Sequence, residues 1–186
     1  FKKKLLKNVD VIFSALPNSD AQKISKQILK NNTLIDLSGD FRIKNVDNYL
    51  KWYKKKHLAK KNIKKSIYFL PELDKGNIKK YQIISCPGCY PTSILLPLIP
   101  LLKKNLINYK NITIDSKSGF SGAGRGIHKK FKNKNLYESF SVYGVSNHKH
   151  NPEIEDQFLK HLNRKVRFNF TPHLIPMFRG IFTSIY

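Results

Sequence analysis

Apolar and polar positions in the first forty residues predict a strand, a helix and a second strand. Residues 9–16 form a short apolar run that is typical of a buried strand. The apolar residues Ala21, Ile24 and Ile28 then recur at helical spacing. Residues 33–37 are again short and apolar. Because strand, helix and strand follow within about 30 residues, the pattern predicts a βαβ unit with parallel strands.

Local signals mark both ends of this predicted helix. Ser19 and Gln22 have the spacing of a capping box, in which Ser19 is the N-cap and Gln22 reaches back to it. Asn31 and Asn32 end the helix. A βαβ unit is half of a doubly wound nucleotide-binding fold, yet no glycine-rich fingerprint precedes it. Either the fold binds no dinucleotide, or the fingerprint lies upstream of Phe1.

The middle of the chain is more varied. Residues 44–66 are rich in Lys and Tyr with weak periodicity, which favours short surface helices. Residues 81–85 form a short predicted strand that leads directly into the two cysteines. Residues 94–105 are apolar but too long for a typical strand, so we expect a buried helix that begins near Pro91. We expect that helix to bend at its internal prolines.

Longer strands and loops follow. Residues 111–120 begin as a strand and end in a glycine-rich loop. Asn151, Pro152 and Glu153 predict a helix start with Asn151 as N-cap. The chain from Val166 onward has β character. This change of pattern near residue 87 is the expected domain boundary.

Composition narrows the function classes. The net charge of +23 attracts anions, but its source is mostly lysine spread along the whole chain. We interpret it as a solvated surface, with a nucleic-acid-binding module as the alternative from another class. No run has the length of a membrane span, no signal peptide is recognisable, and two cysteines make no disulfide framework. We therefore expect a cytoplasmic protein without membrane contact. Because the only methionine is Met177, we also expect a fragment of a longer chain.

The stretch SCPGCYPTS, residues 85–93, holds both cysteines. A redox pair, half of a zinc site, or one nucleophile with a bystander are the alternatives. No second pair of ligands at zinc spacing follows, so we expect no metal. Cys89 lies nearer the predicted helix start, where backbone N–H groups and the helix dipole favour a thiolate and would stabilise an oxyanion. A nucleophile at Cys89 is the interpretation we favour.

A nucleophilic thiol needs a base, and the segment NHKHNPE offers two imidazoles. His148 and His150 alternate as on a strand, so both side chains share one face. Glu153 either interacts favourably with the dipole of its own helix or orients one imidazole.

Six segments occur in an order that resembles one enzyme family. They are DLSGDFR (36–42), LPEL (70–73), PGCYPTS (87–93), DSKSGFSGAGR (115–125), HKHNPEI (148–154) and TPHLIPMFRGI (171–181). Together they closely resemble the N-acetyl-gamma-glutamyl-phosphate reductases, NADPH-dependent enzymes of arginine biosynthesis. The resemblance implies an α/β fold: a partial Rossmann-type parallel sheet, residues 1–87, followed by part of a glyceraldehyde-phosphate-dehydrogenase-like α+β domain for catalysis and dimerisation, residues 88–186.

The resemblance also implies roles for single residues. Cys89 matches the family's nucleophile and His150 its acid/base, while Cys86 departs from the family pattern as a bystander. Arg42 is a plausible anchor for the substrate phosphate, since a guanidinium suits bidentate phosphate contact. We group His148 and Glu153 with Arg42 as substrate-binding residues.

The glycine-rich loop is implied to contact the cofactor, NADP(H). Its candidate residues are Ser118, Gly119, Ser121 and Gly122, whose small size lets a ligand approach the backbone. Phe178 departs from the polar residue of many relatives. The implied partners are a small-molecule substrate and further copies of the chain. A sister reductase that acts on a carrier-protein-linked aminoadipyl or glutamyl phosphate in lysine biosynthesis is the closest alternative.

Overall fold

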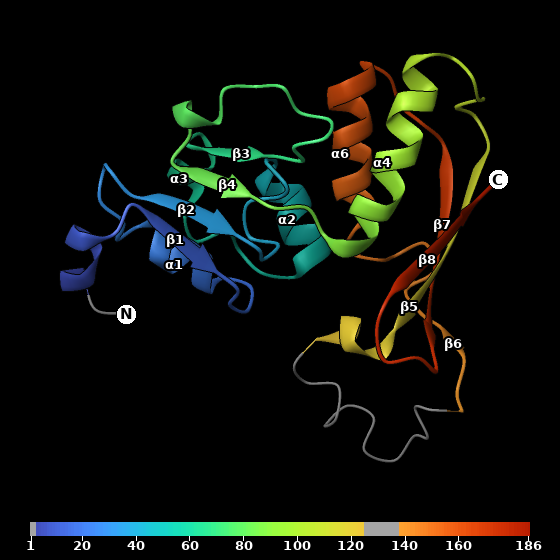
Figure 1. Ribbon diagram of the computed structural model, residues 1–186, viewed down its shortest axis with the longest axis horizontal. Helices are drawn as coiled ribbons and strands as arrows, with labels where there is room; N and C mark the ends of the chain where they lie inside the picture. Colours follow the sequence, from blue (N-terminus) through green and yellow to red (C-terminus); the bar gives the residue numbers. More distant parts are fainter. Residues whose placement is uncertain (1–2, 125–137) are drawn as a thin grey trace. The chain divides into compact units, whose positions relative to one another are not determined.

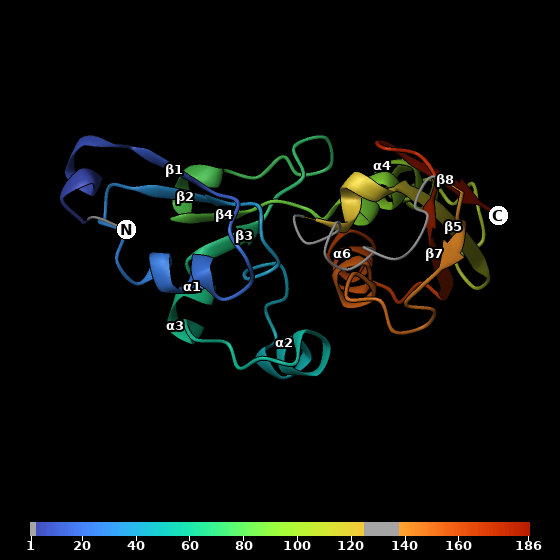
Figure 2. The same ribbon diagram turned by 90° about the horizontal axis from the view of Figure 1, so that it is seen from below.

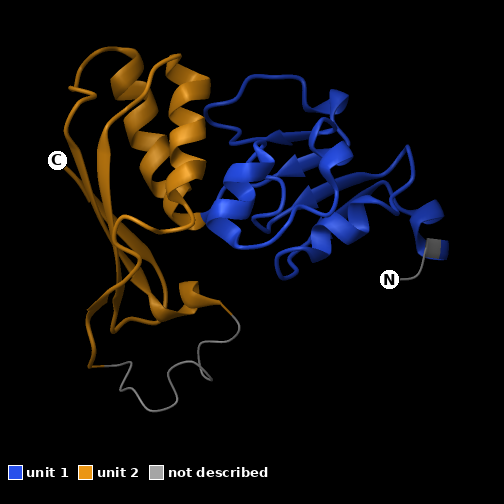
Figure 3. Cartoon of the chain, turned by 180° about the vertical axis from the view of Figure 1, so that it is seen from behind, with its two compact units in different colours: residues 1–88 blue, residues 89–186 orange. Residues whose placement is uncertain are grey.

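The computed structural model describes residues 3–124 and 138–186, and the chain divides into two compact units. Unit 1 comprises Phe1–Gly88 and unit 2 comprises Cys89–Tyr186 (Figure 3). Each unit has its own four-stranded sheet, so each is described by itself.

Unit 1 is built on a parallel sheet. Its strands are β1 (Val11–Ser14), β2 (Thr33–Asp36), β3 (Ser66–Tyr68) and β4 (Ile83–Ser85). They lie in the order β1-β2-β4-β3, and all neighbours run parallel. The predicted βαβ unit is therefore confirmed. The short strand β3 was not predicted.

Short helices complete unit 1. They are α1 (Asp20–Ser25), α2 (Val46–Tyr53) and α3 (Lys60–Ile63), with the 3-10 helices η1 (Lys3–Asn8) and η2 (Ile78–Lys80). Helices α1 and α3 cover the same face of the sheet (Figure 2). Ala21 and Ile24 of α1 pack there against Leu34 and Ile83 of the sheet and against Ala59, which makes the core of this unit.

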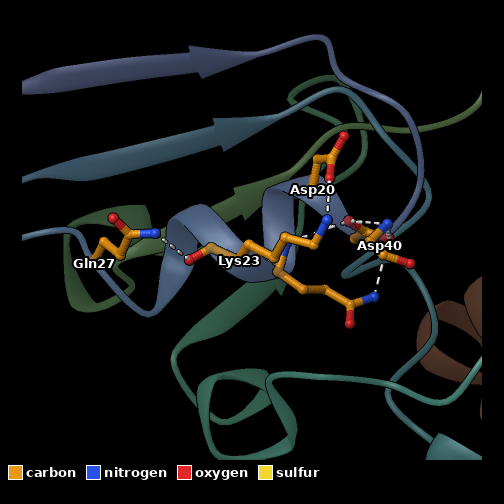
Figure 4. Close-up of polar contacts among 6 residues, drawn as sticks. Asp20, Lys23, Gln27 and Asp40 are labelled. Atoms are coloured by element: carbon orange, nitrogen blue, oxygen red, sulfur yellow. Dashed lines mark hydrogen bonds and ion pairs between the residues drawn. The ribbon is translucent and has the colours of Figure 1, made fainter. Parts of the chain in front are cut away.

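The predicted capping box at the start of α1 is wrong. Ser19 is the N-cap residue, but its side chain makes no capping bond and its φ is 85°. Instead the carboxylate of Asp40 accepts the N–H groups of Ser19, at 2.8 and 2.9 Å, and of Gln22, at 3.3 Å (Figure 4). The amide of Gln22 also donates to Asp40 rather than reaching back to Ser19. A distant charged side chain thus replaces the local cap.

In the described part of unit 2, two helices pack on one mixed sheet. Its elements are α4 (Cys89–Lys103), β5 (Ile112–Gly119), the 3-10 helix η3 (Phe120–Ala123), β6 (Ser141–Val142), α6 (Asn151–Leu162), β7 (Phe168–Ile175) and β8 (Ile181–Ile185). The strand order is β6-β7-β5-β8, in which β5 and β7 are parallel and the outer strands are antiparallel to them.

Helices α4 and α6 lie side by side (Figure 1). Helix α4 begins two residues before the predicted Pro91 and continues through Pro97 and Pro100 as one element. The N-cap of α6 is His150, one residue before the predicted Asn151. Because α4 precedes β5, α6 precedes β7 and these strands are parallel, both helices begin at the same end of the unit. Among the described helices, none is both long and apolar enough to cross a membrane.

Candidate active site

The thiol of Cys89 lies at the first residue of α4. Its side chain is exposed, and the cysteine is free. Strand β4 ends at Ser85, and the three residues that follow turn the chain into the helix. The first turn of a helix has unpaired N–H groups and the positive end of the dipole, so an anion is favoured there. This position suits a thiolate nucleophile.

The turn before Cys89 is held by Arg42. The guanidinium donates through Nε to the carbonyl of Cys86 at 2.8 Å. Through Nη2 it donates to the carbonyls of Leu37 at 3.0 Å and Pro87 at 3.3 Å. Arg42 is only 8% exposed. Its role as phosphate anchor stays a prediction, and these bonds show that the side chain also braces the turn.

Cys86 differs from Cys89 in its surroundings. It is half-buried, its N–H donates to the carbonyl of Asp36 at 2.8 Å, and it is free. Burial raises the pKa of its thiol, and the nearby carboxylate of Asp36 adds to the rise. Cys86 therefore remains a neutral thiol near pH 7, whereas Cys89 is the exposed one.

The two histidines of NHKHNPE lie together at the start of α6. Their ring centroids are 4.8 Å apart, and the N–H of His150 donates to Nδ1 of His148 at 3.2 Å. Burial lowers the pKa of His148 to about 4. His148 is therefore a neutral acceptor near pH 7 that fixes the backbone of His150.

Tyrosines that sequence reasoning missed connect this segment to Cys89. The ring of Tyr90 lies 5.6 Å from that of His148 and 6.1 Å from that of His150. Its hydroxyl donates to the carbonyl of His173 at 3.2 Å, so the hydroxyl of Tyr143, at 3.0 Å, donates to Tyr90. Tyr90 is the neighbour of Cys89 in the motif, which was the available signal. No spacing pointed to Tyr143.

Burial is the main reason why both tyrosines stay protonated. It raises the pKa of Tyr90 and of Tyr143, and the charge of a Cys89 thiolate would raise both further. Both hydroxyls therefore lie within the electrostatic reach of Cys89. Together with the ring contacts to His150, this makes one cluster at the starts of α4 and α6.

Glu153 lies one turn into α6 and is fully buried. Its Oε2 atom is 4.0 Å from Nε2 of His150. A carboxylate this close to an imidazole influences the orientation of the ring. The position favours the orienting interpretation of Glu153 over direct contact with substrate.

The glycine-rich loop divides into a buried and an exposed half. A Cβ on Gly119 would lie 2.8 Å from the backbone nitrogen of Arg179, and one on Gly122 would lie 2.6 Å from Oγ of Ser118. Gly119 and Ser118 are buried and shape the turn, whereas Ser121 and Gly122 are exposed. Only the exposed pair is placed to meet a ligand directly.

The candidate residues are thus split between the units. Unit 2 holds Cys89, His150 and their neighbours, and Arg42 belongs to unit 1. Within residues 3–124 and 138–186, no group of three or more His, Cys, Asp or Glu side chains is placed to hold a metal ion. The described chemistry is that of a thiol, two imidazoles and a carboxylate.

Two protein-family models match the chain. The model of the semialdehyde dehydrogenase NAD-binding domain matches residues 1–81. The model of the semialdehyde dehydrogenase dimerisation domain matches residues 89–186.

Curated relatives are similar along almost the whole chain. An N-acetyl-gamma-glutamyl-phosphate reductase of Desulforamulus reducens is 46% identical over 184 residues, which are 98% of this chain and 53% of that protein. A probable chloroplastic N-acetyl-gamma-glutamyl-phosphate reductase of Arabidopsis thaliana is 47% identical over 182 residues, or 96% of this chain and 44% of that protein. The chain spans about half the length of these relatives.

Solved structures share the fold. An aspartate semialdehyde dehydrogenase from Francisella tularensis aligns with a TM-score of 0.68 at 13% identity, over 100% of this chain and 60% of that one. An aspartate semialdehyde dehydrogenase with NADP from Candida albicans aligns with a TM-score of 0.58 at 17% identity, over 95% and 50%. At such identities the likeness concerns the fold alone.

Proposed function

This chain belongs to the semialdehyde dehydrogenase family, and from that premise we propose that its protein is an N-acetyl-gamma-glutamyl-phosphate reductase. The proposed reaction reduces N-acetyl-glutamyl 5-phosphate to the 5-semialdehyde, with release of phosphate, in arginine biosynthesis. The observation that carries it is the identity of 46% over 98% of the chain with a reductase of that name. The six ordered motifs and the predicted α/β fold agree with the family match.

Cys89 is the proposed nucleophile. Its thiolate attacks the acyl carbon, the bond from that carbon to the phosphate oxygen breaks, and a thioester to Sγ remains. The exposed position at the start of α4 supports this role, because the N–H groups there stabilise both the thiolate and the oxyanion. Arg42 supports it indirectly by fixing the carbonyls of Cys86 and Pro87.

His150 is the proposed acid/base, and Glu153 orients it. The imidazole exchanges a proton with the substrate oxygen as the thiohemiacetal forms and collapses. His148 holds the His150 backbone through Nδ1 and stays neutral, so it adds no competing positive charge. The assignment of His148 and Glu153 is therefore to positioning more than to direct substrate contact.

The exposed half of the loop fits a nicotinamide. Ser121 and Gly122 are small and exposed in η3, while Ser118 and Gly119 support them from below. NADPH, when bound, would supply the hydride for reduction of the thioester. The parallel sheet of residues 1–87 is proposed to be the C-terminal half of the NADP-binding domain, and residues 88–186 to be the N-terminal part of the catalytic and dimerisation domain.

A homo-oligomer in the cytoplasm is the proposed state of the protein. The match to a dimerisation domain supports the oligomer. A small-molecule substrate follows from the reaction, and the proposal needs neither nucleic acid nor a membrane.

The test is an assay of the full-length protein in the reverse direction. N-acetyl-glutamate 5-semialdehyde, phosphate and NADP⁺ should produce NADPH, followed by absorbance. A carrier-protein-linked semialdehyde is the matched alternative substrate. Turnover of the carrier-linked compound alone would replace the proposal with the lysine-pathway reductase, and turnover of neither would reject both.

A further inference from the structure

A pocket of about 700 Å³ opens in unit 1. Three of its lining residues lie just ahead of strands: Lys30 is three residues before β2, and Lys65 and Gln82 directly precede β3 and β4. In a parallel sheet these amino ends share one edge. Strand β4 leads from Gln82 at this edge to Cys86 at the opposite one. Ligands of doubly wound folds bind at the carboxyl edge, so this pocket is a separate place.

The lining is strongly cationic. Five of its twelve residues are lysines and none is acidic. The lysines are Lys26, Lys30, Lys60, Lys61 and Lys65. In the described part of the chain, none of their ammonium groups forms an ion pair or hydrogen bond, whereas Lys23 and Lys117 elsewhere pair with Asp20 and Asp115. The pocket therefore concentrates positive charge without an internal counter-ion.

The floor of the pocket is neutral and fixed. His57 is 4% exposed, and its Nε2 atom donates to the carbonyl of Asp40 at 2.9 Å. Its Nδ1 atom accepts the N–H of Ala59 at 3.2 Å, so both ring nitrogens are engaged in the neutral tautomer. Burial also lowers the pKa of His57. The charge of the pocket near pH 7 thus comes from the lysines alone.

Side-chain hydrogen bonds tie the walls together. The amide of Asn62 donates to the carbonyl and to Oγ of Ser25, at 2.9 and 3.0 Å, which joins the α3 segment to the end of α1. The amide of Gln82 donates to the carbonyl of Leu29 at 2.6 Å. The concave shape is therefore built before any ligand arrives, and this lowers the entropy cost of binding.

We propose that this pocket is a second, non-catalytic site that binds a compact oligophosphate. Clustered ammonium groups bind phosphate as point charges, and a volume of about 700 Å³ holds a ligand of nucleotide size. An extended polyanion does not need a concavity, so the pocket shape favours the compact ligand. The proposal stands on unit 1 alone and is independent of the proposed reductase activity.

The test is calorimetric titration of the full protein with inorganic triphosphate, and separately with ATP, at constant physiological ionic strength. One variant carries Lys60→Gln, Lys61→Gln and Lys65→Gln. The matched control carries Lys75→Gln, Lys79→Gln and Lys80→Gln, which removes the same charge from exposed positions of unit 1 outside the pocket. All six side chains are exposed, so the core stays intact.

Saturable binding of one triphosphate per chain is expected for the wild type and the control, with affinity about tenfold or more weaker in the pocket variant. A similar affinity for ATP would show that the site recognises the phosphate groups rather than the nucleoside. Equal weakening in both variants, or no saturable binding by the wild type, would overturn the proposal, because the attraction would then be diffuse. Binding of a polyuridylate that triphosphate does not displace would overturn it in favour of a nucleic-acid surface. Reductase activity without triphosphate should be equal in all three proteins.

Discussion

The starts of helices α1 and α4 have the same electrostatic property but differ in how it is used. Each helix follows a strand of the parallel sheet and has unpaired N–H groups in its first turn. At α1 a buried carboxylate from Asp40 accepts those groups. At α4 the first residue is the exposed Cys89. At α1 an internal anion accepts the free N–H groups and stabilises the fold, whereas at α4 the helix start is occupied by the proposed nucleophile.

This difference separates stability from chemistry within the chain. Asp40 also accepts from Gln22 Nε2 at 3.0 Å and from the hydroxyl of Tyr49 at 2.9 Å, so its charge is fully satisfied. Cys89 has an exposed thiol, with the neutral hydroxyls of Tyr90 and Tyr143 nearby. The comparison predicts that changes at Asp40 reduce stability, whereas changes at Cys89 reduce turnover.

The largest expected effect is at Cys89. Cys89→Ser in the full-length protein should lower the turnover rate at least about a thousandfold, because no other described group can form the thioester. Unfolding by urea should be almost unchanged. The rate is measured by the absorbance of NADPH.

Cys86→Ser is the matched control for this variant. Its thiol is half-buried and its pKa is raised, so most of the activity should remain. An equal loss in both variants would contradict a single nucleophile.

The next largest effect is on the closed helix start. Asp40→Asn places an amide donor against N–H donors, so unit 1 should lose about 3 kcal/mol of unfolding free energy. The only tryptophan of the chain, Trp52, lies in α2, so its fluorescence in urea reports on unit 1. Asp47→Asn, at an exposed position in the first turn of α2, should cost less than about 1 kcal/mol. Equal losses of unfolding free energy in the two variants would mean that the buried carboxylate of Asp40 stabilises unit 1 no more than an exposed one does.

A third prediction concerns the pH dependence of the stability of unit 2. Folded His148 titrates at about 4 rather than 6.5, so between these values the unfolded chain binds the additional proton. The stability of unit 2 should therefore fall by up to about 3 kcal/mol as pH drops through this window. His148→Phe cannot titrate and should lose less. Amide hydrogen exchange of α6 measures the effect, and parallel pH profiles of the two proteins would refute it.

The last expected effect is similar in size to that of His148, but it has the opposite sign and lies in unit 1. Burial raises the pKa of Asp36 from 3.8 to about 6, so between these values the folded chain binds the additional proton. Acidification through this window should stabilise unit 1 by up to about 3 kcal/mol from this group, and Asp36→Asn should abolish that gain. His57 is common to both proteins, so its own titration cancels in the difference. Trp52 fluorescence provides the readout, and a constant difference between the proteins across the window would count against the assignment.

Local sequence patterns predicted the regular elements well where burial decides the structure. The apolar run at β2 and the apolar spacing of α6 were recognisable because each element buries one face. Strand β1 forms where it was predicted, but the expectation that it is buried is wrong, because Val11 is 47% and Phe13 71% exposed. Strand β3 was missed because it has only three residues, too few for a periodic signal. The bounds of α4 were shifted by two residues, since Pro91 is tolerated in the first turn of a helix.

Contacts between residues far apart in the sequence could not be predicted from local patterns. The residues at Ser19 have the spacing of a capping box. However, the carboxylate of Asp40, 21 residues later, accepts hydrogen bonds from the N–H groups that the capping box would have paired. Tyr143 reaches Tyr90 across 53 residues, which no local pattern encodes. Motif order identified the candidate nucleophile, whereas the neutral state of His148 required knowledge of its burial.

The division of the chain between Gly88 and Cys89 has a consequence for any hinge between the two units. Cys89 follows the last residue of unit 1 directly, so a single virtual bond of about 3.8 Å joins its Cα atom to that of Gly88. Arg42 clamps the carbonyls just before that bond. The sulfur of Cys89 therefore stays beside the last residue of unit 1, whatever the arrangement of the two units.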